Sequence, residues 1–183
     1  MGKVYILLAD GFEEIEGLTC VDLMRRAGID IEMISVSDSL TVKGARGISV
    51  LADGYLKDVG LEGDMVILPG GMPGTNNLKE NESVRIIVRA YHEAGKYVAA
   101  ICAAPTVLAY MGLLEGRKAT CYPGLEDKLT GAEWPGESLS VVVDENIITS
   151  RGLGTAIDFA LKLIELLIDK DKADEIAKSV VYK

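Results

Sequence analysis

One cysteine stands where an α/β chain most readily turns a thiol into a nucleophile. The run from Ala100 to Pro105 has the sequence Ala-Ile-Cys-Ala-Ala-Pro, between an apolar stretch typical of a central parallel strand and the first turn of a helix. Free backbone N–H groups and the positive end of the helix dipole favour a thiolate at such a corner. The sequence therefore predicts a nucleophilic Cys102 with a pKa below that of a free thiol. A buried structural cysteine is the alternative.

Two further segments are expected to emerge at the same edge of the sheet as Cys102. They follow the first and the fourth expected strands and comprise residues 10–16 (Asp-Gly-Phe-Glu-Glu-Ile-Glu) and 69–74 (Pro-Gly-Gly-Met-Pro-Gly). Gly70 and Gly71 can adopt backbone angles closed to other residues, so their N–H groups, with that of Ala103, would form an oxyanion site. A plain glycine turn is the alternative.

Three acids, Glu13, Glu14 and Glu16, stand at the start of the first expected helix. Acids at such positions are commonly surface residues that interact with the helix dipole. Glu16 lies one turn into the helix, whose apolar stripe faces the sheet, and it could turn toward the thiol. Burial and a nearby thiolate would raise its pKa, which would let Glu16 donate a hydrogen bond to sulfur and carry a proton.

The single histidine of the chain, His92, lies near the end of the helix that precedes the Cys102 strand. At ~3.3 Å per strand residue, it falls at the opposite edge of the sheet, roughly 15 Å or more from the thiol. We therefore expect an exposed His92 and no Cys-His dyad within the chain. A carboxyl group must then serve Cys102.

The elements that must position these residues alternate between strands and helices. The expected strands are residues 3–9, 29–36, 65–68, 96–101, 118–121, 139–143 and 147–150, and the expected helices are residues 13–27, 83–94, 105–110, 154–168 and a short one from 172. A hairpin-like excursion surrounds the glycine-rich residues 43–47. Two helices carry apolar stripes, made of Ile15, Leu18, Val21 and Met24 and of Ile157, Leu161, Ile164 and Ile168. This alternation predicts a mostly parallel sheet with helices on both faces and ligands at the carboxyl ends of its strands.

Size and composition favour a single domain over residues 1–183, with a net charge of -9 and no basic stripe. Nucleic acid and anionic membranes are therefore unexpected partners. The apolar stretches fall short of the ~18 residues of a spanning helix, and the opening Met-Gly-Lys leads straight into a strand, so we expect no signal peptide. Three cysteines, Cys20, Cys102 and Cys121, form no paired or metal-ligating pattern. We expect a cytoplasmic protein with no metal and no cofactor.

Five stretches together are highly specific: residues 9–16 (ADGFEEIE), 22–28 (DLMRRAG), 68–71 (LPGG), 99–105 (AAICAAP) and 149–155 (TSRGLGT). With them the chain resembles the ThiJ/PfpI superfamily, within it the subgroup of the parkinsonism-linked deglycase and bacterial YajL. The resemblance implies a flavodoxin-like three-layer sandwich, like that of class I glutamine amidotransferases, and a homodimer. It also implies that Cys102 is an oxidation-sensitive nucleophile hydrogen-bonded to Glu16, that Gly71 and Ala103 are backbone oxyanion donors, and that Arg46 pairs with Glu13 of the other chain.

The chain departs from the family pattern at Tyr122, where the parkinsonism-linked protein has a histidine. Tyr122 can donate a hydrogen bond to a substrate oxygen but is no base near neutral pH, which makes peptidase chemistry unexpected. The resemblance suggests glutathione-independent glyoxalase or protein deglycase chemistry, which needs only a thiolate, a proton shuttle and oxyanion donors. We therefore expect Cys102 and Glu16 to act on a small aldehyde or a glycated substrate. The alternative is a redox-sensing or chaperone-like stress-response dimer that is signalled by oxidation of Cys102.

Overall fold

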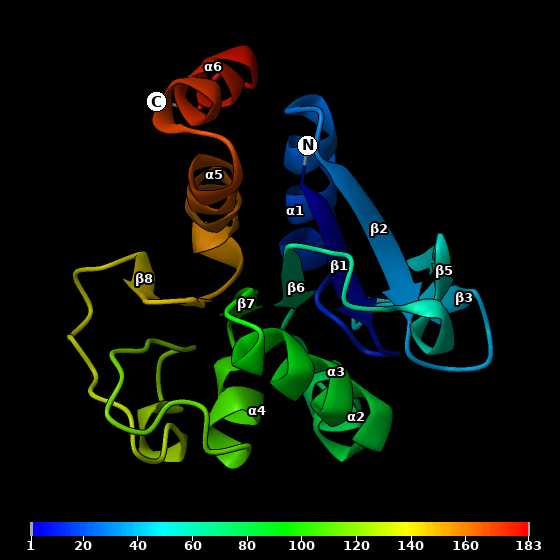
Figure 1. Cartoon of the computed structure of the whole chain (residues 1–183), viewed down its shortest axis with the longest axis vertical. Coiled ribbons are helices and arrows are strands. Elements are labelled where there is room, and N and C mark those ends of the chain that lie inside the picture. Colours follow the sequence, from blue (N-terminus) through cyan, green and yellow to red (C-terminus); the bar gives the residue numbers. More distant parts are fainter. Residues whose placement is uncertain (1, 183) are drawn as a thin grey trace.

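A computed structural model of the chain describes residues 2–182. Within them, a seven-stranded sheet has the order β5-β2-β1-β6-β7-β9-β8, and every neighbouring pair is parallel except β9 and β8 (Figure 1). Its strands are β1 (Lys3–Leu8), β2 (Asp30–Ser35), β5 (Gly54–Tyr55), β6 (Met65–Leu68), β7 (Tyr97–Ile101), β8 (Val141–Asp144) and β9 (Ile147–Ser150). A separate antiparallel hairpin joins β3 (Thr41–Lys43) to β4 (Ser49–Leu51). The carboxyl ends of β1, β6 and β7 therefore meet at one edge of the sheet.

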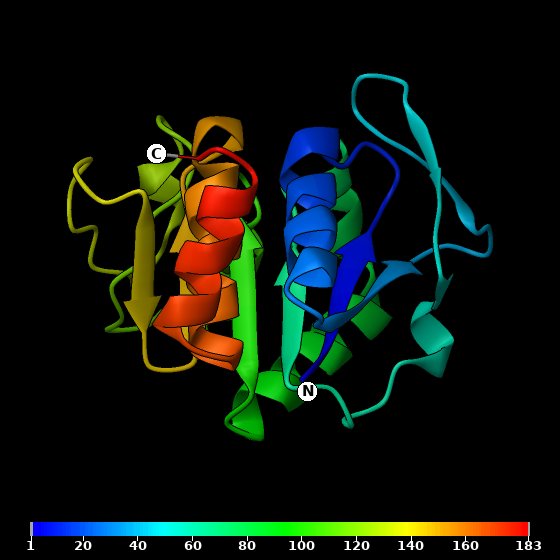
Figure 2. The same ribbon diagram turned by 90° about the horizontal axis from the view of Figure 1, so that it is seen from above.

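Helices cover both faces of the sheet. In Figure 2, α1 (Glu14–Arg26) stands beside α5 (Ala156–Leu167) on one face, and α6 (Lys170–Ser179) packs on α5. The other face carries α2 (Gly74–Glu80), α3 (Glu82–Glu93) and α4 (Pro105–Tyr110). Short 3₁₀ turns are η1 (Leu56–Asp58), η2 (Glu126–Lys128) and η3 (Leu153–Thr155). Two apolar cores result, one on each side of the sheet, and the predicted covered parallel sheet is confirmed.

The structure lacks one predicted strand and contains one helix that the sequence did not predict. Residues 118–121 form no strand: Lys118 makes an isolated bridge with Glu133, and the N–H of Thr120 donates to the Thr149 hydroxyl at 2.9 Å. The Thr120 N–H, which would bond to a neighbouring strand in a sheet, is thus bound to a side chain instead. Helix α2 was not predicted, because it begins at Gly74 within a segment whose glycines and prolines indicate a loop.

The predicted apolar stripes are partly wrong. In α1, Val21 and Met24 are buried, but Ile15 is 50% exposed, and the face turned inward at the start of the helix bears Glu14 and Glu16 instead. In α5 the buried residues are Ala156, Phe159, Ala160, Leu163 and Ile164, while Ile168 is exposed. The inward face of α1 therefore delivers carboxyl groups, rather than aliphatic side chains, to the edge where Cys102 lies.

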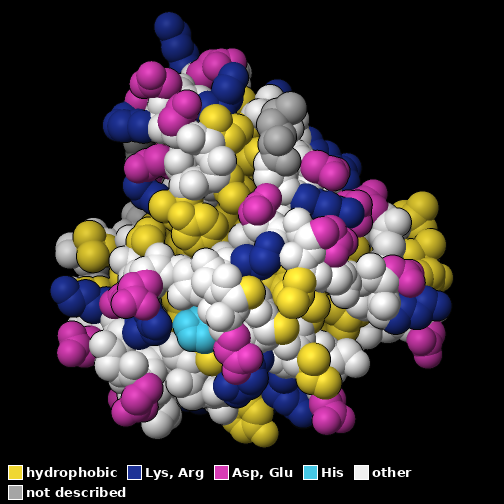
Figure 3. Space-filling view, viewed as in Figure 1, with side chains coloured by type: hydrophobic (Ala, Val, Ile, Leu, Met, Phe, Trp, Pro, Cys, Tyr) yellow, Lys and Arg dark blue, Asp and Glu magenta, His cyan; other side chains and the backbone are white. Residues whose placement is uncertain are grey.

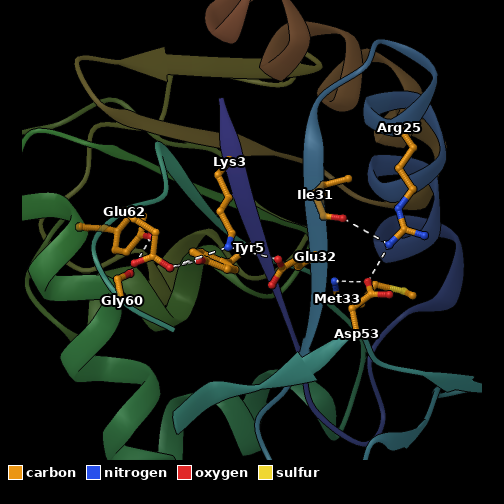
Figure 4. A network of polar contacts seen from close by, with 10 residues as sticks. Lys3, Tyr5, Arg25, Ile31, Glu32, Met33, Asp53, Gly60 and Glu62 are labelled. Carbon is orange, nitrogen blue, oxygen red and sulfur yellow. Dashed lines mark hydrogen bonds and ion pairs between the residues drawn. The ribbon is translucent and has the colours of Figure 1, made fainter. Parts of the chain in front are cut away.

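A network of polar contacts joins α1, β1 and β2 to the segments before and after β5 (Figure 4). Arg25 donates to Asp53 at 2.6 Å, and the same carboxylate accepts the N–H of Met33 at 2.8 Å. On β1, the Tyr5 hydroxyl donates to Glu62. These contacts link α1, β1 and β2 to the connections around β5.

The molecular surface mixes charges of both signs. On the face shown in Figure 3, Lys and Arg side chains are interspersed with Asp and Glu. Among the described helices, none combines the length and the apolar character that crossing a bilayer requires.

Candidate active site

Cys102 occupies the turn that joins β7 to α4. Its φ of 66° lies in the left-handed region, which a non-glycine residue adopts only under constraint. Two backbone hydrogen bonds supply that constraint: the Cys102 N–H donates to the Ser150 carbonyl at 3.0 Å, and the Cys102 carbonyl accepts from the N–H of Tyr122 at 2.7 Å. The half-buried thiol is thereby held at the carboxyl end of the central strand, in a nucleophile elbow.

Glu16 meets the thiol from helix α1. Its side chain is 1% exposed and hydrogen-bonds with Cys102. One carboxylate oxygen, Oε2, accepts the N–H of Gly70 at 3.0 Å, and the carboxylate also accepts the N–H of Leu153. Three separate segments of the chain therefore fix one carboxyl group against one sulfur.

The glycines after β6 allow this close approach. A Cβ on Gly70 would lie 2.5 Å from the Cys102 Cβ and 2.6 Å from Oε2 of Glu16, and Gly71 has a φ of +91°. The N–H groups of Gly71 and Ala103 both hydrogen-bond to the Cys102 sulfur. The Gly70 N–H, which we expected in the oxyanion site, is instead engaged with Glu16, because its peptide faces the carboxylate.

Burial dominates the electrostatics of the pair. It raises the pKa of Glu16 to about 7, and the hydrogen bonds from Cys102 and Gly70 only partly oppose it. Burial, followed by the charge of Glu16 and the hydrogen bond with it, raises the pKa of Cys102 to about 12 against the smaller effect of two N–H donors. The predicted lowering of the Cys102 pKa is therefore wrong, since burial and the neighbouring carboxylate outweigh the N–H groups of Gly71 and Ala103.

The two groups are hydrogen-bonded and titrate as a coupled pair, so that a single proton can pass between them. Transfer of the thiol proton to Glu16 along their hydrogen bond gives the thiolate without placing two negative charges in the site. The N–H groups of Gly71 and Ala103 stabilise that thiolate. The pair can thus supply a nucleophile and an acid in the same step.

The remaining acids of α1 hold the β3–β4 hairpin over the site. Glu14 is 2% exposed, and its Oε1 accepts the N–H groups of Arg46 at 2.7 Å and Ile48 at 3.3 Å. Arg46 also approaches Glu13 of its own chain, with 3.9 Å between its Nη2 and the carboxylate Oε2. Within one chain the hairpin thus lies against the start of its own helix, and the pairing of Arg46 with Glu13 of a second chain stays a prediction.

A cavity of about 500 Å³ opens onto the thiol. Its walls come from α1, the hairpin, and the segments after β6, β7 and β9, and they include Arg46, Met72, Leu125 and Leu153. Tyr122, which is 52% exposed, also lines this cavity, in agreement with its expected place beside the substrate. His92 is not among the lining residues, but it is half-buried rather than exposed, and burial lowers its pKa.

Leu153 was missed by the sequence reasoning as a site residue. It acts through its backbone, which no side-chain pattern reveals, and the stretch Arg-Gly-Leu-Gly after the last strand was the signal for it. Among residues 2–182, no group of three or more His, Cys, Asp or Glu side chains is placed to hold a metal ion.

Comparison with known proteins identifies the family. The model of the DJ-1/PfpI family matches residues 2–166. The chain belongs to this family. It is 40% identical to Protein dj-1beta of Drosophila melanogaster over 177 residues, which cover 96% of this chain and 95% of that protein.

Two further relatives are similar to this chain over nearly their whole length, one by its solved structure and one by its sequence. The crystal structure of a DJ-1 superfamily protein from Salmonella typhimurium has a TM-score of 0.94 and 37% identity, with 100% of both chains covered. The predicted flavodoxin-like sandwich and the family resemblance are thereby confirmed. A Caenorhabditis elegans protein named glutathione-independent glyoxalase DJR-1.2 is 34% identical over 174 residues, which cover 94% of this chain and 92% of that protein.

Proposed function

We propose that this DJ-1/PfpI protein converts small reactive carbonyl compounds without glutathione, with Cys102 as nucleophile and Glu16 as proton carrier. The observation that carries the proposal is the sulfur itself, which two N–H donors and a buried acid surround at the floor of an open cavity. The name of one relative, a glutathione-independent glyoxalase, supports this substrate class. Protein deglycase chemistry, on glycated adducts of the same aldehydes, would use the same groups.

The steps balance for methylglyoxal. The Cys102 sulfur adds to the aldehyde carbon, and the new oxygen takes the proton that Glu16 received from the thiol, which gives a hemithioacetal. The Glu16 carboxylate then takes the proton of that carbon and returns it to the neighbouring carbon, while the hydroxyl proton of the hemithioacetal passes to the ketone oxygen. The aldehyde carbon is thereby oxidised to a thioester and the ketone carbon is reduced to an alcohol. Water hydrolyses the resulting thioester to lactate and frees the thiol. The N–H groups of Gly71 and Ala103, and the Tyr122 hydroxyl, are the proposed donors to the substrate oxygens.

Lactate formation from methylglyoxal in glutathione-free buffer tests the proposal. We expect turnover by the unaltered protein, none by Cys102→Ser, and a loss of at least about 100-fold in Glu16→Gln, since general acid–base catalysis contributes that much. Cys121→Ala is the matched control, because this thiol is buried and does not line the cavity. Full turnover by Cys102→Ser, or none by the unaltered protein, would reject the enzyme.

The same geometry favours a second candidate, a redox sensor. Oxidation of Cys102 to a sulfinate would place two oxygens beside the N–H groups of Gly71 and Ala103 and the Glu16 carboxyl group, all of which can hydrogen-bond to them. Mild peroxide should then add two oxygens, about 32 Da, to the Cys102 peptide before the Cys20 and Cys121 peptides. Equal oxidation of all three would reject this role.

We further propose a cytoplasmic homodimer that meets through α1 and the β3–β4 hairpin. Ile15 and Ile48 are 50% and 55% exposed, and the link from Glu14 to the Ile48 N–H holds them on adjoining segments. All three cysteines are free, which suits a reducing compartment. Sedimentation at micromolar concentration should give twice the mass of the 19.6 kDa chain, and Ile48→Asp should weaken the association. A single-chain mass at every concentration would exclude the dimer.

A further inference from the structure

A second cavity continues from the catalytic one. It has a volume of about 440 Å³ and runs between α2, α4 and the η2 turn. The two cavities share Met72, Ala103 and Leu125 as lining residues, so they adjoin next to the residue that follows Cys102. A substrate larger than methylglyoxal would therefore extend its non-reacting end into this second cavity, which we call the lysine groove.

The lysine groove bears positive charge in a chain that is strongly acidic. Lys79 and Lys128 line it, together with Asp127, which leaves a formal charge of +1 where the whole chain has -9. Within the described residues, neither lysine forms an ion pair. The Lys79 ammonium group instead lies over the Tyr110 ring, 5.7 Å from its centroid, which holds it at the groove while its N–H donors stay available.

Neutral hydrogen-bonding groups accompany the two lysines. Thr75 lines the groove from α2 and is 3% exposed, and its hydroxyl has no hydrogen-bond partner among the described residues. A buried hydroxyl without a protein partner is costly, and a polar atom of a ligand or an ordered water at this wall would satisfy it. Asn76 adds an amide to the same wall. With Asp127 included, the groove combines a net charge of +1 with neutral polar groups, which suits a singly charged anion more than a phosphate dianion.

We propose that the lysine groove binds a carboxylate at the non-reacting end of the carbonyl substrate, so that Lys79 and Lys128 give the enzyme a preference for acidic α-ketoaldehydes. This inference rests on the proposed carbonyl chemistry of Cys102. It adds a substrate class, namely aldehydes whose second end bears a carboxylate several bonds from the reacting carbon.

A matched pair of substrates tests this preference. 4-Carboxyphenylglyoxal and its methyl ester share the reacting group and differ in the charge at the far end. We expect kcat/KM to favour the acid by about fivefold, the size of effect that partly exposed charge pairs give. The preference should fall to about twofold or less in the Lys79→Gln/Lys128→Gln variant.

Lys57→Gln is the control variant. Its ammonium group also lies over a tyrosine ring, 5.0 Å from the Tyr55 centroid, but outside the groove. The substitution removes the same charge and the same kind of ring contact as Lys79→Gln alone, so it should leave the preference intact. An equal loss of preference in Lys57→Gln would show that net charge, rather than the groove, is responsible, and would overturn the proposal.

Binding without turnover separates this proposal from the enzymatic one. In Cys102→Ser, calorimetry should show tighter binding of 4-acetylbenzoate than of its methyl ester, with the difference lost when both groove lysines are glutamine. If neither glyoxal is turned over by the unaltered protein, the enzymatic proposal fails while this calorimetric comparison still decides the groove. Equal binding of acid and ester would overturn the groove, even if methylglyoxal is turned over normally.

Discussion

Replacing Glu16 by glutamine removes a buried charge while it nearly preserves the size of the side chain, so the stability of the fold should change with pH. The carboxyl group is 1% exposed, and burial raises its pKa from 4.5 to about 7. At about 1.36 kcal/mol per pKa unit, the fold loses about 3 kcal/mol when the group ionises. The raised pKa means that this stability is fully present below pH 4.5 and is lost as the pH rises through about 7.

Glutamine cannot ionise, so the Glu16→Gln variant should not show this loss. We expect its free energy of unfolding, relative to that of the unaltered protein, to rise by up to about 3 kcal/mol between pH 4.5 and pH 8. Urea denaturation at several pH values in that range measures the difference. The other acids of the chain titrate in both proteins, so their contribution cancels when the two curves are subtracted.

The thiol provides an internal check on the cause. Its hydrogen bond to Glu16 lowers the Glu16 pKa, so the pH-dependent difference should widen when the comparison is repeated in a Cys102→Ala background. A difference that stays constant from pH 4.5 to pH 8 would refute the raised pKa and, with it, the shared proton on which the proposed chemistry depends. Together with the expected loss of turnover, a more stable Glu16→Gln variant would show that the site retains this acid at the expense of stability.

Three other substitutions test the geometry around the site. Gly70→Ala should abolish turnover and destabilise the fold by about 1–3 kcal/mol, because the added Cβ would collide with both members of the catalytic pair. Gly154→Ala is the control: an added Cβ there meets no atom within 4 Å, so turnover and thermal denaturation should change little. Glu14→Ala should lower kcat/KM for methylglyoxal and increase protease cleavage in the β3–β4 hairpin, since two backbone N–H groups lose their acceptor. An unchanged cleavage pattern would show that Glu14 does not hold the hairpin in place. Asp53→Ala should cost about 1 kcal/mol or less in urea denaturation and leave turnover unchanged, because its contacts with Arg25 and with the Met33 N–H are partly exposed and remote from the site.

The architecture of this protein could be predicted from the order of apolar runs, acids and glycines in its sequence. Strand-like runs separated by amphipathic helices require a parallel sheet covered on both faces, and the corner at Cys102 follows from an apolar strand that leads into Pro105. The errors arose where local pattern and tertiary contact disagree. Residues 118–121 have strand-like composition but give a hydrogen bond to a side chain, and the Gly74 segment forms a helix despite its loop-like composition.

The tertiary structure decided the chemistry of the site. Sequence spacing suggested that Glu16 turns toward Cys102, but the pKa of each depends on burial and on the charge of the other, which arise when α1 packs beside the turn after β7. The destinations of the Gly70 and Leu153 N–H groups are likewise properties of the packed backbone. Residue types and strand ends, which are local, can be inferred from the chain. The protonation of a thiol and a carboxyl group in contact cannot, because it depends on solvent exclusion by segments far apart in the sequence.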